Sequence, residues 1–247
     1  SIALAAAPPG SAKGRFRLVQ QGDPFDLSVP LRIRLASGET RQAVVRVRDR
    51  ETAIDPAATA VAEPARQVEL DPDLRLWRRL DTQALPPIFR ETFISPRSQV
   101  LVAGGAEWTA PAMQLAGRLL ESQLQPVSED RLLASTDLPA LVVGDRDSVS
   151  GLVARLGLGA LPQVLLQEVP APATGAAAPL KGTAQAWTAR APNGKTLVFV
   201  MAADVASLQA LQRSMPHYGR QSWLVFDAGR VVGQGAWPVA VQSLSLE

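Results

Sequence analysis

The side chains with the widest catalytic repertoire are scarce in this chain, and the few that occur lie close together. Its 247 residues include no Cys, one His at position 217 and one Tyr at position 218. Arg220 follows two residues later. A Cys nucleophile and a zinc site built from several His residues are therefore excluded, and a Ser-His-Asp triad could use only His217.

This His-Tyr-Arg cluster is the first candidate site. His titrates near neutral pH and is the commonest general base, so His217, Tyr218 and Arg220 could carry acid-base chemistry or bind a ligand. No Gly-x-Ser-x-Gly motif supplies a nucleophile. The more ordinary interpretation is a structural loop in which the His and Tyr side chains hydrogen-bond to the backbone.

A pair of glycines and a pair of aspartates form two further candidates, each directly after an apolar run. Gly104 and Gly105 could place backbone N–H groups around an anion at a helix N-terminus, or could simply form a tight turn. Asp145 and Asp147 could hold a divalent cation with substrate oxygens, or could cap a helix. Neither Gly-x-Gly-x-x-Gly nor the Walker motif is present, which disfavours dinucleotides and triphosphates.

The first half of the chain has the alternating pattern of β-strands. Residues 25–35 place these apolar side chains on one face: Phe25, Leu27, Val29, Leu31, Ile33 and Leu35. A turn at 36–39 leads to a return strand at 40–48, and further strands are expected at 15–20 and 65–70. A period of two is typical of antiparallel sheets with one buried face, so a small β-sandwich is predicted. Pro30 lies on the polar face and suggests an edge strand or a bulge.

The second half alternates strands with helices. Apolar runs predict these strands: 99–105, 140–145, 185–190, 196–200, 222–227 and 231–235. Helices are expected to begin near Thr109, near Asp147 or Ser148, and at Asp204. This order predicts a three-layer α/β domain with a mainly parallel sheet and an antiparallel hairpin at its edge. Residues 170–179 are expected to form a surface loop.

The length and the change of pattern predict two domains. We expect a linker or disordered N-terminus at 1–13, a β-sandwich domain at 14–94 and the α/β domain at 95–247. Pro86 and Pro87 stiffen the expected connector. The N-terminal run of small apolar residues is compatible with the remnant of a signal peptide or with a linker.

Composition narrows the range of partners. The net charge is +2, aromatic residues make up 5%, and no Lys/Arg run resembles a nucleic-acid footprint, so nucleic acid is not an expected partner. No apolar stretch is long enough to span a bilayer. The absence of Cys suits a bacterial envelope or periplasm and equally the cytoplasm.

The first half carries a family resemblance. An alternating strand at 25–33 and its return strand are followed by Val68-Glu69-Leu70-Asp71-Pro72-Asp73, Leu76-Trp77-Arg78-Arg79-Leu80 and Leu85-Pro86-Pro87. Together these segments, over about residues 14–90, resemble the Ig-like sandwich that follows the catalytic domain of M1-family zinc aminopeptidases. The run Pro216-His217-Tyr218-Gly219 before an aromatic strand is similar to the tail of M1-like bacterial proteins. The catalytic motifs of that family, Gly-x-Met-Glu-Asn and His-Glu-x-x-His, are not in this sequence.

The resemblance implies a structural or partner-orienting role as the C-terminal region of a metallopeptidase. Its partner would be the catalytic domain of the same polypeptide, with zinc bound there, and neither a metal nor a cofactor is expected in this chain. Two alternatives stay open: an independent α/β enzyme or small-ligand domain that uses the loop around His217, and a pure interaction module. A pocket joining the Gly104, Asp145 and His217 loops would favour the former, and an exposed apolar patch on the sandwich the latter.

Overall fold

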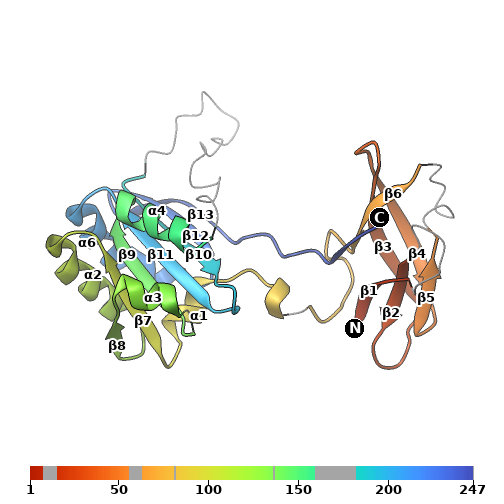
Figure 1. The fold of residues 1–247 in the computed structure, drawn as a ribbon, viewed down its shortest axis with the longest axis horizontal. Helices are drawn as coiled ribbons and strands as arrows, with labels where there is room; N and C mark the ends of the chain where they lie inside the picture. Colours follow the sequence, from red (N-terminus) through yellow and green to blue (C-terminus); the bar gives the residue numbers. More distant parts are fainter. Residues whose placement is uncertain (8–15, 56–62, 81, 136, 159–181, 247) are drawn as a thin grey trace. The chain divides into compact units, whose positions relative to one another are not determined.

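The computed structural model describes residues 1–7, 16–55, 63–80, 82–135, 137–158 and 182–246, which fall into two compact units (Figure 1). The β unit comprises Ser1–Leu85 and Val239–Glu247, and the α/β unit comprises Pro86–Pro238. The chain therefore leaves the β unit, builds the whole α/β unit and then returns. In terms of connectivity, the α/β unit is an insertion in the β unit.

The β unit contains two antiparallel sheets. One has the order β1 (Ile2–Ala6), β2 (Phe16–Gln20), β5 (Glu51–Ile54), and the other has the order β14 (Ser243–Ser245), β6 (Ala65–Leu70), β3 (Leu27–Leu35), β4 (Thr40–Val47). Both sheets contribute to one hydrophobic core: Leu4 and Phe16 from the first sheet pack in the same cluster as Leu31 and Val68 from the second. Packing of this kind follows from the period-two pattern, because alternate side chains face the partner sheet.

Three details of the β unit differ from the sequence prediction. Residues 2–6 are not a linker but strand β1, because Ile2 and Leu4 alternate into the core and the strand pairs with β2. Phe25 lies before β3 and is 66% exposed, so it does not share the buried face. Pro30 is not on an edge strand, since β3 pairs with both β4 and β6. The Pro30 carbonyl accepts a hydrogen bond from the Asp71 N–H, next to the Leu31–Leu70 pair at which the pairing of β3 with β6 begins. The sheet does not need a hydrogen bond from the Pro30 nitrogen at this position, so proline is tolerated there.

The domain limits also differ from those predicted at residues 94 and 95. Pro86–Phe93 belong to the α/β unit, and the last residues belong to the β unit. The returning segment is held by β14, which pairs with β6, and by the Gln242 side chain, which bonds to both the N–H and the carbonyl of Leu4 at 3.2 Å. A short final strand carries little pattern of its own, and its pairing partner is far away in the sequence.

A substitution in this returning strand should destabilise only the β unit. Leu244 packs against the β-unit core, so Leu244→Asp places a charge there and should cost about 2 kcal/mol of unfolding free energy. Ser243→Asp, at an exposed position of the same strand, is the matched control. Hydrogen exchange followed by mass spectrometry should show faster exchange in β6 and β3 for Leu244→Asp, with the α/β unit unchanged. Equal exchange in the two variants would contradict the assignment.

The α/β unit is built on a seven-stranded mixed sheet with the order β13-β12-β10-β11-β9-β7-β8. Its strands are β7 (Ser98–Ala103), β8 (Leu124–Pro126), β9 (Ala140–Asp145), β10 (Ala184–Arg190), β11 (Thr196–Ala202), β12 (Trp223–Asp227) and β13 (Arg230–Gly235). From β8 to β11 the neighbours are parallel, whereas β10, β12 and β13 pair antiparallel. The sheet is thus less parallel than predicted, because the short turn between β10 and β11 permits only antiparallel pairing.

Helices cover both faces of this sheet (Figure 1). The helices are α1 (Phe89–Phe93), α2 (Ala106–Leu119), α3 (Glu129–Ala134), α4 (Arg146–Arg155), α6 (Val205–Ser214) and the short helix η3 (Met215–Tyr218). Residues of α1, α2 and α6 share one core cluster with Leu141 and Val143, and residues of α3 and α4 share the other with Ala140 and Val142. Alternation along β9 therefore supplies both cores. In the described part of the chain, no helix has the length and apolar character that a membrane crossing requires.

Helices α2 and α4 begin earlier than predicted. Helix α2 has Gly105 rather than Thr109 as its N-cap, because Trp108 is buried and already belongs to the helix, which leaves Pro111 inside it. Helix α4 is capped by Asp145 rather than by Asp147 or Ser148. Helix α6 begins after Asp204, as predicted, and the Asp204 carboxylate accepts from the Ser207 N–H. The predicted surface loop at 170–179 lies outside the described residues.

Candidate ligand site at the His217 loop

The predicted site residues lie at two opposite ends of the α/β sheet. Gly104 directly follows β7, and Asp145 is the last residue of the adjacent strand β9, so both lie at the carboxyl ends of the parallel strands. We call residues 215–222, between the end of α6 and the start of β12, the His217 loop. Helix α6 runs back along the sheet after β11, so this loop lies at the other end of the sheet. His217, Tyr218 and Arg220 line one pocket, whereas Gly104 and Asp147 line another. The three predicted loops therefore do not converge on one pocket.

At the strand carboxyl ends, helix capping occupies the groups that a ligand would use. Asp145 Oδ1 accepts from the Ser148 N–H and Oδ2 accepts from the Ser148 hydroxyl, each at 2.8 Å. Gly104 has a φ of +142° and packs so closely that a Cβ there would lie 2.7 Å from Asp145 Oδ2. Asp147 is exposed. Across the part of the chain that the structure describes, no three His, Cys, Asp or Glu residues gather in a way that could hold a metal.

The cap gives Asp145 a pH-dependent contribution to stability. Burial alone would raise the pKa of Asp145, but hydrogen bonds from the Ser148 N–H and hydroxyl outweigh it, so the pKa lies below its ordinary value of 3.8. A carboxylate with a lowered folded pKa stabilises the fold above the unfolded pKa, and this contribution is lost as the pH falls through the folded pKa.

We therefore expect Asp145→Ala to lower the unfolding free energy by about 1 kcal/mol at neutral pH. The difference in unfolding free energy between Asp145→Ala and the wild type should become smaller as the pH falls below 3.8. Urea unfolding at about pH 7 and about pH 3 measures both values. Asp147→Ala, which removes an exposed first-turn acid, is the control, and a deficit for Asp145→Ala that is unchanged at low pH would contradict this account.

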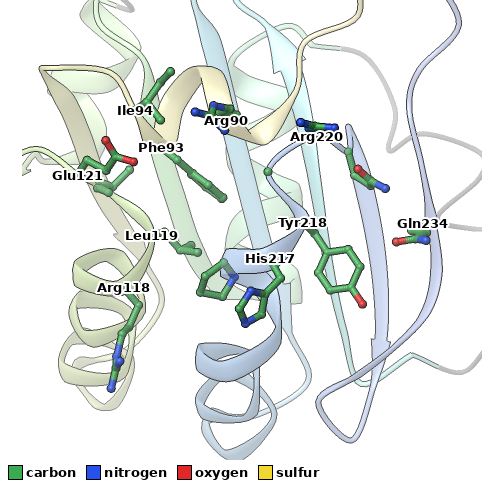
Figure 2. A pocket seen from close by; sticks show the side chains of 14 residues that line it. Arg90, Phe93, Ile94, Arg118, Leu119, Glu121, His217, Tyr218, Arg220 and Gln234 are labelled. Carbon is green, nitrogen blue, oxygen red and sulfur yellow. The ribbon is translucent and has the colours of Figure 1, made fainter.

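The pocket at the other end is formed by α1, the end of α2, the His217 loop and β13 (Figure 2). Backbone hydrogen bonds hold these segments together. The Arg90 N–H donates to the Gly219 carbonyl at 2.7 Å, and the Phe89 N–H donates to the Gln221 carbonyl at 3.0 Å. The Glu121 N–H donates to the Phe93 carbonyl at 2.9 Å. The frame of the pocket is therefore fixed by the main chain, independently of its charged side chains.

Arginines dominate the charge of this region. Arg90, Arg118 and Arg220 line the pocket together with a single acid, Glu121. An adjoining pocket shares Arg118 and His217 and adds Arg213. We call these two adjoining pockets the basic groove. The four arginine side chains are exposed, and among the described residues none of them forms an ion pair.

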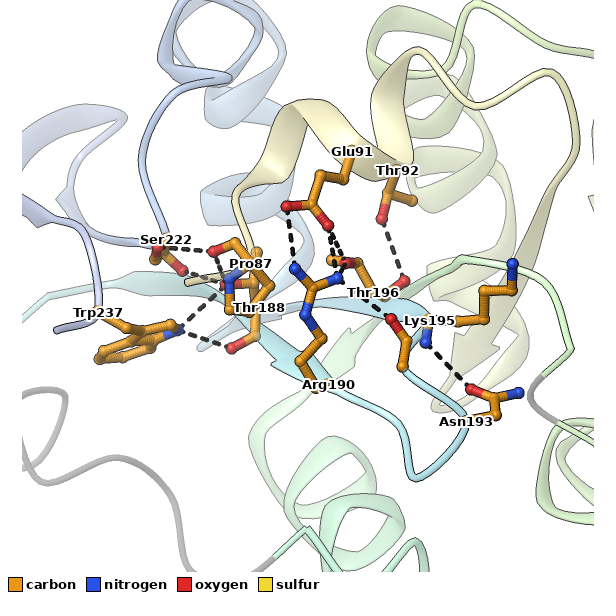
Figure 3. Close-up of polar contacts among 11 residues, drawn as sticks. Pro87, Glu91, Thr92, Thr188, Arg190, Asn193, Lys195, Thr196, Ser222 and Trp237 are labelled. Carbon is orange, nitrogen blue, oxygen red and sulfur yellow. Dashed lines mark hydrogen bonds and ion pairs between the residues drawn. The ribbon is translucent and has the colours of Figure 1, made fainter. Parts of the chain in front are cut away.

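A polar network binds Glu91, the neighbour of Arg90 in the chain, to residues of β10 and β11 (Figure 3). Glu91 accepts from Arg190 Nη1 at 2.7 Å and from the Thr196 hydroxyl at 2.5 Å. The Pro87 carbonyl accepts from the hydroxyls of Thr188 and Ser222, at 2.8 and 2.6 Å. These contacts fix α1 and the segment before it against β10 and β11, so Arg90 is held at the groove while its acidic neighbour is already paired.

Comparison with models of known protein families gives no match, and comparison with curated proteins gives none either. The interpretation of the groove therefore rests on its own chemistry. Guanidinium groups bind carboxylates and other oxyanions through paired N–H donors. His217 is exposed, and none of the described residues is hydrogen-bonded to its ring. The arrangement is suited to binding an anionic ligand.

Sequence reasoning found part of this site. It identified His217, Tyr218 and Arg220, which are neighbours in the chain, but missed Arg90, Arg118 and Arg213. The position of Arg118 and Arg213 in the last turns of α2 and α6 was a weak signal, because basic residues at helix C-termini are commonly explained by the helix dipole. Only the fold brings these helix ends together.

Proposed function

We propose that this chain is a non-catalytic accessory region of a larger protein, with an M1-type zinc metallopeptidase as the parent that the sequence resemblance suggests. In this proposal the β unit is an Ig-like sandwich that docks on the catalytic domain, and the zinc belongs to that domain. A location in the bacterial envelope or periplasm would follow from such a parent. The α/β unit then serves as a further binding module.

The observation that supports the proposal most strongly is that the Trp77 side chain is held in an exposed position. Its side chain is fully exposed, with a relative accessibility of 106%. The segment around it is nevertheless held in place, because the Asp71 carboxylate accepts from the N–H groups of Arg75 and Leu76 at 2.7 and 3.1 Å. Arg78 follows Trp77 in the chain, and its side chain, only 9% exposed, lies 3.4 Å from the same carboxylate. A large apolar side chain fixed in an exposed position is typical of an interaction surface, where Trp is a frequent anchor.

Other exposed apolar side chains of the β unit support the same conclusion. Val44 is 71% exposed and lies opposite Pro30 on the outer side of the β3–β4 pair. Leu74 is 41% exposed, and its N–H donates to the Asp71 carbonyl, while the Asp71 N–H donates to the Pro30 carbonyl. The sheet and the Asp71 segment thus offer apolar surface close together, which supports docking of a partner.

The test compares this chain with the protein extended by whatever its gene encodes upstream. Hydroxyl-radical oxidation of each Trp is read by mass spectrometry, with the buried Trp108 and Trp187 as internal references. We expect strong oxidation of Trp77 in the present chain and clear protection in the extended protein. A Trp77→Ala variant should leave the fold intact but loosen the docked region. Equal oxidation of Trp77 in both proteins would contradict docking through this surface.

A second candidate function is favoured by the basic groove. The α/β unit could act as an independent ligand-binding domain that uses the His217 loop, as the charge of the groove supports. Binding of an anionic ligand by the present chain, together with unchanged Trp77 oxidation in the extended protein, would favour this alternative.

A further inference from the structure

The charge of the basic groove is local and does not reflect the composition of the unit around it. Residues 86–238 contain twelve Lys and Arg against eleven Asp and Glu, so the unit as a whole is nearly neutral. Within the part of the chain that the structure describes, the groove is lined by Arg90, Arg118, Arg213 and Arg220 and by one acid, Glu121. Like charges that line one groove repel one another, and an anionic ligand that binds along the groove relieves this repulsion.

Helix dipoles explain the positions of only some of these arginines. Arg118 and Arg213 lie in the last turns of α2 and α6, where a cation is favoured by the helix dipole. Arg90 lies in the last turn of α1, a helix of only five residues whose dipole is small. Arg220 lies beyond η3, in the turn before β12, so no helix dipole explains its position.

The spacing of the arginines indicates the shape of the ligand. Figure 2 shows Arg90 and Arg220 on one side of the pocket, and Arg118 and His217 on the opposite side. The side chains do not converge on one point, as a clamp for a single phosphate would. The arrangement is suited to an extended ligand that carries several separated negative charges.

The remaining lining residues indicate the chemistry of the ligand between its charges. Gln209, Gln212, Gln221 and Gln234 supply amide groups that can both donate and accept hydrogen bonds, as a peptide backbone requires. Ile94 is 45% exposed at the pocket, beside the almost fully buried side chains of Phe93 and Leu119. A surface for a purely ionic polymer would not need an exposed aliphatic side chain, whereas a peptide with an aliphatic side chain would pack against it.

We propose that the basic groove binds an extended acidic peptide segment, with its carboxylates paired to arginines at both ends of the groove and an aliphatic side chain against Ile94. The inference goes beyond the proposed accessory function, because it depends on the α/β unit alone and holds for any parent protein. Tyr218 and Gln234 border the groove on the side of β13.

The test measures binding of a fluorescent peptide that alternates Glu and Leu to the full chain by anisotropy at low and high salt. The control peptide carries Gln in place of each Glu, and a short inorganic polyphosphate serves as a second ligand. We expect the acidic peptide to bind more tightly than the neutral one, with an affinity that falls as salt rises.

Variants of the protein assign this binding to the groove. The double variant Arg118→Gln/Arg220→Gln should weaken binding of the acidic peptide about tenfold. Arg146→Gln, an exposed arginine at the start of α4 at the other end of the unit, is the matched control and should bind as wild type does. Because the replaced side chains are exposed and form no ion pair with the residues that the structure describes, circular dichroism should show an unchanged fold.

Three results would overturn the proposal: equal binding of the neutral peptide, equal weakening by Arg146→Gln, or binding of polyphosphate without binding of the acidic peptide. Since none of these outcomes depends on Trp77 or on an upstream domain, failure here and failure of the accessory function can be told apart.

Discussion

Replacing Asp71 by Ala should lower the unfolding free energy of the β unit by about 3 to 5 kcal/mol, because it leaves a buried charge without its partner. Asp71 is fully buried, and its carboxylate lies 3.4 Å from Arg78 Nε, whose side chain is only 9% exposed. The same carboxylate accepts two backbone N–H groups that would otherwise have no acceptor there. The variant therefore removes an ion pair and two hydrogen bonds together.

Two further variants separate these contributions. Asp71→Asn keeps an acceptor oxygen and tolerates the φ of +48° at this position, but removes the charge, so its cost should be smaller than that of Asp71→Ala. Asp73→Ala removes a carboxylate that pairs with Arg32 and Arg75 at the surface, which should cost about 1 kcal/mol or less. Urea unfolding gives all three values. If Asp71→Ala cost no more than Asp73→Ala, the Asp71 segment would not be fixed in the way that the presentation of Trp77 requires.

The second large effect is expected at Gly144 in β9. A Cβ there would lie 1.7 Å from the Ala103 carbonyl oxygen on the neighbouring strand β7, a distance that no rotamer change can relieve. Gly144→Ala should therefore force the two strands apart and cost about 3 kcal/mol or more. Because Gly104 and Asp145 lie at the same end of these strands, the geometry at the start of α4 should be disturbed as well.

Gly117→Ala is the matched control for this substitution. Gly117 lies in α2, and nothing is within 4 Å of the position that its Cβ would take. Alanine there should raise the unfolding free energy by about 1 kcal/mol, since glycine is a poor helix former. Opposite signs for the two glycines in thermal unfolding are the expected result. A Gly144→Ala variant as stable as wild type would show that the close approach of β7 and β9 is not real.

Local pattern was sufficient to predict most of the elements. The alternation in β3 and the apolar runs of β9 and β11 identified strands, because burial on one face or on both leaves a direct trace in the residue order. The same reasoning missed β1, where small alanines between Ile2 and Leu4 hide the alternation. It also misplaced the start of α2, since a buried Trp near a helix N-terminus resembles a loop residue.

What the sequence could not indicate were pairings between distant segments. The pairing of β14 with β6 joins Leu244 to Val68, and no local pattern marks it. The basic groove likewise depends on Arg90, Arg118 and Arg213, which lie on three different helices and meet only after the sheet has formed. The capping role of Asp145, by contrast, was among the alternatives that its position before a helix suggested.

The reading frame upstream of Ser1 tests most directly the proposal that the chain is an accessory region of a larger enzyme. If the proposal is right, the gene encodes a His-Glu-x-x-His motif with a downstream Glu, in frame and ahead of the β unit. A start codon, or a signal peptide placed directly before Ser1, would contradict the proposal and leave the anionic ligand of the basic groove as the function to establish.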